Sequence, residues 1–174
     1  MEANHQPRSP LEMSGLRTVA VGFDGSADSK VALLWAVALC ELTGAVLRVI
    51  HVVGLLEERY LTHLAPAEAD VALHIATDSG LPAHRFEWEQ LSGSPSEALV
   101  RATNPPNSVD LLVLGNGGSA CFPGTLLGST SLEVAQLSSV PVTIVPNPAG
   151  GRQNPFPRPD FWSSQRTIIT EQDA

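Results

Sequence analysis

Residues 109–146 read VDLLVLGNGGSACFPGTLLGSTSLEVAQLSSVPVTIVP. This stretch opens with an apolar run from Val109 to Leu114 and closes with a second run from Pro141 to Val145, and both runs have the length and composition of buried strands. A glycine-rich segment and a helix expected over about 129–137 lie between them. Strand, loop, helix and strand in this order predict one unit of a parallel sheet.

The same alternation fills the chain before residue 109. Strands are expected over 16–23, 45–53 and 85–91, and helices over 28–43, about 57–79 and 95–102, with Pro66 kinking or interrupting the second helix. The sequence therefore predicts an α/β fold, a single doubly wound domain with a five-stranded parallel sheet and helices on both faces. We expect residues 1–15 to form a flexible N-terminal arm, residues 16–147 the domain, and residues 148–174 a Pro-rich, largely disordered C-terminal tail.

Composition narrows the classes of function. The net charge of -8 argues against binding to nucleic acid or to an anionic membrane surface, since both attract basic patches. Two cysteines, Cys40 and Cys121, form neither a disulfide framework nor a metal-binding spacing. With no signal peptide or membrane-spanning stretch apparent, we expect a cytoplasmic protein.

The glycine-rich segment has the features of a phosphate site. Glycine lets a ligand approach the backbone closely, and the start of a helix offers N–H groups and a partial positive charge. The segment Gly128 to Ser131 would supply both amides and hydroxyls. It contains no GK[ST] motif and lacks the spacing of the dinucleotide fingerprint, and a surface loop with an ordinary helix cap is the alternative.

Asp24 follows the first strand and would lie at the same edge of the sheet. Its carboxylate could accept a hydrogen bond from an adenine amino group or a ribose hydroxyl, or help to hold a metal ion. A turn stabilised by the same carboxylate is the simpler alternative.

Three segments resemble the universal stress protein family: TVAVGFDGSADSKVALLWA (18–36), VLRVIHVV (46–53) and the stretch quoted above. The last fits the family's ATP-binding pattern of glycine, two residues, glycine, nine residues, glycine and serine or threonine, through Gly115, Gly118, Gly128 and Ser129. The resemblance implies a nucleotide-binding sheet of strand order 3-2-1-4-5 and a homodimer that pairs through the fifth strand, Pro141 to Val145.

The resemblance also implies a set of binding residues. Those for adenine and ribose would be Gly22, Phe23, Asp24 and, through its backbone, Val52; Leu114 and Gly115 would lie beneath the nucleotide; Gly118, Gly128, Ser129, Thr130 and Ser131 would hold the ribose and phosphates. No Lys, Arg or His occurs between Arg101 and Arg152. A bound ATP, ADP or AMP would therefore depend on amides, hydroxyls, the helix dipole and, for the longer phosphates, Mg²⁺.

No residue pattern indicates fast catalysis. His51, inside a predicted strand, is expected to be a core or supporting residue, and Trp35 and Trp88 are expected in the core. We therefore expect an adenine-nucleotide-binding regulatory stress-response protein, with slow or no hydrolysis and acting through dimer or partner contacts. The alternatives are a nucleotide-free dimeric interaction module and, because residues 24–29 distantly resemble the loop of ATP pyrophosphatases, an adenylylating enzyme.

Three aromatic residues lie in the expected tail. Phe156, Phe161 and Trp162 either pack back on the domain or form a docking peptide for a partner.

Overall fold

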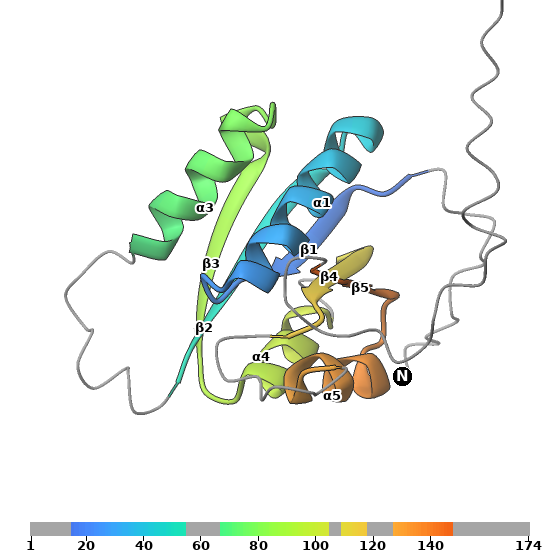
Figure 1. Cartoon of the computed structure of the whole chain (residues 1–174). Coiled ribbons are helices and arrows are strands. Elements are labelled where there is room, and N and C mark those ends of the chain that lie inside the picture. The colour runs from blue at the N-terminus through green and yellow to red at the C-terminus, as the bar shows by residue number, and fades with distance from the viewer. Residues whose placement is uncertain (1–14, 55–66, 105–108, 118–126, 148–174) are drawn as a thin grey trace, which may run out of the picture.

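A computed structural model describes residues 15–54, 67–104, 109–117 and 127–147. They form one five-stranded parallel sheet with the strand order β3-β2-β1-β4-β5 (Figure 1). In chain order the elements are β1 (Thr18–Gly22), α1 (Ala27–Thr43), β2 (Val46–Val53), α3 (Ala67–Asp78), the short 3-10 helix η2 (Ala83–Arg85), β3 (Phe86–Ser92), α4 (Pro95–Ala102), β4 (Leu111–Gly115), α5 (Ser129–Leu137) and β5 (Val142–Val145). The predicted fold class and strand order are confirmed.

Alternating side chains of the strands divide the core into two layers. On one face, α1 and α3 cover the odd-numbered residues of β1, such as Val19 and Val21. On the other face, α4 and α5 cover Ala20 of β1 and Leu112 of β4. Figure 1 shows these two pairs of helices on opposite sides of the sheet. A sheet covered on both faces explains why its strands are nearly continuous apolar runs.

Local sequence signals set both ends of α1. The Ser26 side chain accepts a hydrogen bond from the Ser29 N–H at 3.1 Å, as an N-cap does. Gly44 ends the helix with φ of 75°, a left-handed conformation that favours glycine. Ser26 and Gly44 therefore mark the two ends of α1.

One expectation needs correction, and several others concern residues outside the described part of the chain. Trp35 is not a core residue, because 41% of its surface is exposed on the outer side of α1. The predicted middle helix is observed as α3 over Ala67–Asp78, while its first part and Pro66 lie outside the described residues. Cys121 and the tail aromatics also lie outside them.

Candidate functional site

The candidate site lies at the carboxyl edge of the sheet, where β1 and β4 end side by side. These are the neighbouring strands at which the chain changes direction across the sheet, and ligands of open α/β sheets bind at such a point. Both strands end in glycine. A Cβ on Gly22 would come within 2.6 Å of the Leu114 Cδ2 atom, and one on Gly115 within 2.8 Å of the Asp28 backbone carbonyl. The first turn of α1 thus packs directly on the end of β4.

The loop after β1 exposes Asp24. Its Oδ1 atom accepts a hydrogen bond from the Ser26 N–H at 3.0 Å, and Gly25 has φ of 76°. The carboxylate thus stabilises the turn, as the simpler sequence interpretation expected, while its side chain remains exposed at the edge of the sheet.

His51 holds this loop from β2. Its Nδ1 atom lies 2.8 Å from the Phe23 carbonyl oxygen, and because a carbonyl only accepts, Nδ1 carries the hydrogen. The imidazole stacks on the Trp88 ring of β3, with the two ring centroids 5.6 Å apart. The Trp88 and Phe23 rings lie edge to face, with their centroids 6.4 Å apart. His51 is therefore a supporting residue, as expected, and it fixes the backbone just before Asp24.

The start of α5 lies against the end of β4. The Gly128 N–H donates to the Asn116 carbonyl at 2.8 Å, and a Cβ on Gly128 would lie 3.4 Å from the Gly117 Cα atom. The buried Ser131 hydroxyl donates to the Gly115 carbonyl at 2.8 Å. These contacts place the first turn of α5 beside the glycine edge, although residues 118–126 lie outside the described part of the chain.

This first turn contains the predicted phosphate-binding residues. The first N–H groups of a helix have no partner within it, and Gly128, the N-cap of α5, has no side chain to cap them. Ser129 is exposed and Thr130 is half-buried, whereas the Ser131 hydroxyl is already committed to Gly115. Gly118, the remaining predicted residue of this group, lies outside the described residues.

A polar cluster that the sequence analysis missed joins three elements at this edge. The Asn147 N–H donates to the Asn116 Oδ1 atom at 3.3 Å, and the Asn147 side-chain amide donates to the Asp28 Oδ1 atom at 2.8 Å. Asn116 directly follows β4, Asn147 lies two residues after β5, and Asp28 is in the first turn of α1. These positions are the only signal that the sequence offers. The cluster holds the ends of β4 and β5 to the start of α1.

Val52 and Leu114 lie deeper at the same edge. Leu114 is buried in the layer covered by α4 and α5, and Val52 packs partly buried against that layer. The end of β4, the start of α5 and β5 carry no basic side chain, since no Lys, Arg or His occurs between Arg101 and Arg152. The described residues contain no group of three or more His, Cys, Asp or Glu side chains placed to hold a metal ion. Among them, no helix is long and apolar enough to cross a membrane.

The fold and its glycine-lined edge define an open parallel α/β protein with a candidate ligand site at the β1–β4 switch point. A sequence profile of the universal stress protein family matches residues 15–146. The chain belongs to this family.

Individual relatives agree with this assignment. Universal stress protein Rv1636 of Mycobacterium tuberculosis is 31% identical over 147 residues, which span 76% of this chain and 98% of the relative. A universal stress protein of Thermus aquaticus is 30% identical over 138 residues, covering 74% and 98% of the two chains.

Solved structures show the same fold. A universal stress protein crystallised in complex with cAMP is 32% identical, with a TM-score of 0.59 over 74% of this chain and 95% of that one. Protein MJ0577 has a TM-score of 0.64 over 76% and 96% of the two chains, and at 22% identity it supports the fold alone.

Proposed function

We propose that the protein binds an adenine nucleotide across the carboxyl edge of β1 and β4 and acts as a regulatory member of its family. The observation that carries this proposal is the hydrogen bond from the Gly128 N–H to the Asn116 carbonyl, which brings the start of α5 to the end of β4. A helix N-terminus beside a glycine edge is suited to an anion. The 32% identical relative that was crystallised with cAMP supports an adenine nucleotide as the ligand.

Each side of the site has a distinct role in this proposal. The base and ribose contact Gly22, Phe23, Asp24 and the Val52 backbone, above Leu114 and Gly115. The phosphate is held by Gly118, by the amides and hydroxyls of Ser129 and Thr130, and by the amide of Ser131. Gly128 lets the phosphate approach closely, while its N–H donates to the Asn116 carbonyl. The Ser131 hydroxyl instead supports the Gly115 backbone, because it already donates to that carbonyl.

The lack of basic side chains between Arg101 and Arg152 affects which nucleotides should bind most tightly. A helix terminus contributes about 0.3 to 1 kcal/mol to binding an exposed charge, and up to about 2 kcal/mol in a partly buried site. A helix terminus without a basic side chain or a metal ion cannot offset the charge of a triphosphate. We therefore propose that nucleotides with one phosphate bind at least as tightly as free ATP, and that ATP binds with Mg²⁺, for which Asp24 is the nearest exposed acid of the loop.

The proposed role is regulatory, with slow or no hydrolysis. His51, the histidine nearest the loop, uses its Nδ1 atom to hold the Phe23 backbone. The residues proposed to touch phosphate supply amides and hydroxyls, which stabilise a bound anion but do not abstract a proton at neutral pH. A pyrophosphate-release assay distinguishes this proposal from an adenylylating enzyme, which would release pyrophosphate from ATP.

Calorimetric titration of the full chain with cAMP, AMP and ATP, with and without Mg²⁺, tests the proposal. Gly128→Glu places a carboxylate at the proposed phosphate position and should abolish binding by charge repulsion. Gly15→Glu is the matched control, because a side chain there meets nothing within 4 Å and lies before β1, far from the edge. Unchanged affinity of Gly128→Glu would refute the site.

A nucleotide-free interaction module is the second candidate. At the phosphate end, Asn147 donates through its backbone N–H to the Asn116 side chain and through its own side chain to Asp28, and no basic residue occurs between Arg101 and Arg152. Absence of heat with all three nucleotides, together with a folded dimer, would favour this candidate.

A further inference from the structure

Helix α1 is apolar around its whole circumference. From Val31 to Cys40 the chain carries ten consecutive apolar residues. One face, which includes Leu33 and Val37, is buried against the sheet and α3. On the outer side, Leu34 is 47%, Trp35 41% and Leu42 86% exposed. A helix that is apolar all round is normally covered on every side, so the outer side is a surface that lacks a partner among the described residues.

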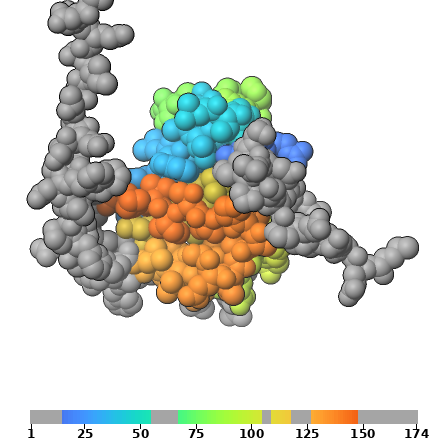
Figure 2. Space-filling view, turned by 90° about the vertical axis from the view of Figure 1, so that its right-hand side faces the viewer, coloured from blue at the N-terminus to red at the C-terminus, as the bar shows by residue number. Residues whose placement is uncertain are grey.

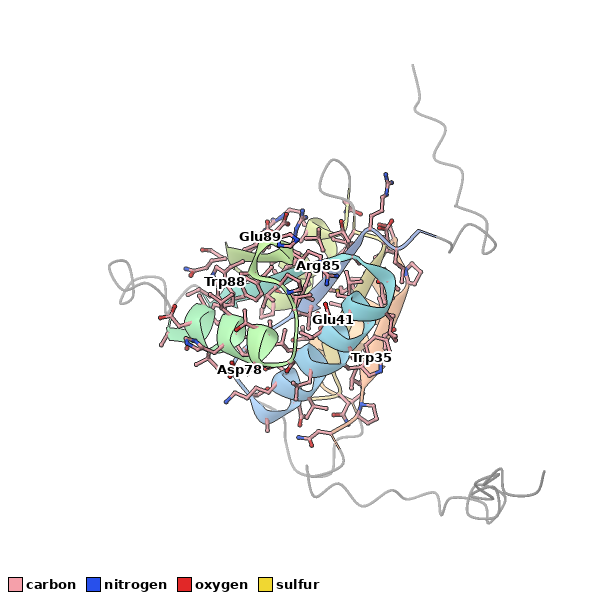
Figure 3. All side chains as sticks on the ribbon, turned by 90° about the horizontal axis from the view of Figure 1, so that it is seen from above. Trp35, Glu41, Asp78, Arg85, Trp88 and Glu89 are labelled. Atoms are coloured by element: carbon pink, nitrogen blue, oxygen red, sulfur yellow. The ribbon has the colours of Figure 1, made fainter. Side chains whose placement is uncertain are left out.

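These exposed residues form one stripe. Leu34, Trp35, Ala38 and Leu42 fall within about 100° of the helix circumference, given 3.6 residues per turn. Trp35 marks the flank of the stripe that lies beside β5, as the labelled side chain in Figure 3 shows. Figure 2 likewise shows α1, in blue and cyan, directly next to the orange surface of α5 and β5. We call these four residues the α1 stripe.

The chain leaves the described domain beside this stripe. Asn147, the last residue described, donates through its side chain to the Asp28 Oδ1 atom at 2.8 Å. Asp28 and Trp35 are seven residues apart on the helix and therefore lie on the same flank, about 10 Å apart along the axis. The described part of the chain therefore ends about two helical turns from Trp35.

Residues 148–174 have both the reach and the chemistry to cover the stripe. Phe156 is nine residues beyond Asn147 and reaches up to about 30 Å in an extended chain, whereas Leu42 is about 21 Å from Asp28 along the helix. Phe161 and Trp162 lie further along the chain and can therefore also reach the length of the stripe. Aromatic side chains bury large apolar areas.

Tethering favours this segment over a second copy of the protein. A site joined by a short linker experiences an effective concentration of about millimolar, which exceeds ordinary protein concentrations. The segment also carries three Arg and three acidic side chains, so its approach to a domain of net negative charge is not opposed by repulsion. We propose that residues 148–174 dock on the α1 stripe of their own chain, through Phe156, Phe161 and Trp162.

Fluorescence of Trp35 tests this docking in the full chain. Trp88→Phe and Trp162→Phe leave Trp35 as the single tryptophan and keep an aromatic ring at both replaced positions. Adding Phe156→Ser and Phe161→Ser should shift the Trp35 emission to longer wavelength and raise its quenching by acrylamide. Ser163→Ala with Ser164→Ala is the control and should change neither. Equal quenching in all three proteins would overturn the proposal, as would quenching that depends on protein concentration, which indicates a second copy.

Cross-linking gives an independent measurement if the single-tryptophan protein does not fold. In a Cys121→Ser background, cysteines at Leu42 and Ser163 should join within one chain through a short bis-maleimide. A pair at Leu137 and Ser163 should react far less, because Leu137 is an exposed leucine of α5, which covers the opposite face of the sheet. Equal yields for the two pairs would contradict docking on α1.

Discussion

Gly115 lies where the end of β4 passes beneath the first turn of α1. A methyl group at this position would approach the Asp28 backbone carbonyl to 2.8 Å, and backbone cannot move aside as a flexible side chain can. Spacing in the sequence singled out this glycine for a ligand, whereas the structure also shows a packing reason for it. The two roles can be separated, because the ligand role affects nucleotide affinity and the packing role affects the free energy of unfolding.

Gly115→Ala is therefore expected to destabilise the fold by about 1 to 3 kcal/mol, the usual cost of overpacking a tight contact. Denaturation in urea measures the change in the free energy of unfolding. Gly15→Ala is the control and should be close to neutral, since nothing lies within 4 Å of its added methyl group. Equal stability of both variants would mean that α1 does not pack on β4 as described.

The buried thiol of Cys40 leads to a prediction of how the free energy of unfolding depends on pH. Burial raises the pKa of its thiol from an ordinary value of 9.0 to about 11. Above pH 9 the unfolded chain loses a proton that the folded protein keeps, so this thiol lowers the free energy of unfolding as the pH rises from about 9 to about 11. Cys40→Ala should show a smaller decline over that range in urea denaturation, and an identical decline would contradict the buried thiol.

The residues of the site differ in how far the sequence could predict them. Gly115 and Gly128 stand in a recognisable spacing between a strand and a helix. The Asp28, Asn116 and Asn147 cluster could not be predicted, because its members are up to 119 residues apart and meet only once the sheet forms. The commitment of the Ser131 hydroxyl to Gly115 was likewise invisible, since the sequence does not say which hydroxyl faces inward.

At the scale of single elements, the end of α1 depends on a residue from a different part of the chain. The last turn of α1 contains no basic residue of its own. Arg85, from η2, donates to the Cys40 carbonyl at 2.9 Å and forms an ion pair with Glu41 (Figure 3). It thus supplies the positive charge that favours a helix C-terminus.

Arg85→Ala should destabilise the protein by about 1 to 3 kcal/mol, the range for a hydrogen bond to a charged group. Thermal and urea denaturation give the change. Arg48→Ala removes a second ion pair of the described residues, with Glu87, whose side chain is 52% exposed, and should cost less than about 1 kcal/mol. If the two variants lose the same stability, Arg85 does not act as the cap of α1.

Most elements were predictable because each carries its own signal. β1, β2 and β5 are rich in β-branched residues, and α1 has its cap and stop at Ser26 and Gly44. The signal of β3 is weaker, since it contains no β-branched residue. Trp35 was placed wrongly because α1 is apolar on every side, so its periodicity does not say which face is buried. The same property of α1 leads to the proposed docking stripe.

At the scale of the whole molecule, β5 is one edge of the sheet. The Pro141 and Val145 carbonyls accept hydrogen bonds from β4, at 3.0 Å and 3.2 Å. Because backbone groups alternate in direction along a strand, Val142 and Ile144 present theirs to the open edge. This edge suits the homodimer that the family resemblance led us to expect, in which two β5 strands meet.

If the protein forms this homodimer, Ile144→Pro should convert it to a monomer, because it removes an N–H from the open edge while leaving the bonds of Val145 to β4 in place. Ile144→Ala is the matched control: it loses similar packing but keeps the N–H, so it should remain dimeric. Sedimentation of both variants measures the change. A wild-type protein that sediments as a monomer, or an Ile144→Pro variant that stays dimeric, would rule out pairing through β5.

The central claim is that one edge of the sheet holds an adenine nucleotide, with base and phosphate at separate places. Amide chemical shifts from nuclear magnetic resonance, recorded with adenosine and with AMP, test this directly. Both ligands should shift the amides of Phe23 and Asp24, and only AMP should shift those of Ser129 and Thr130 at the start of α5. If AMP shifts neither group, or if adenosine and AMP shift the start of α5 alike, the account of the site is wrong.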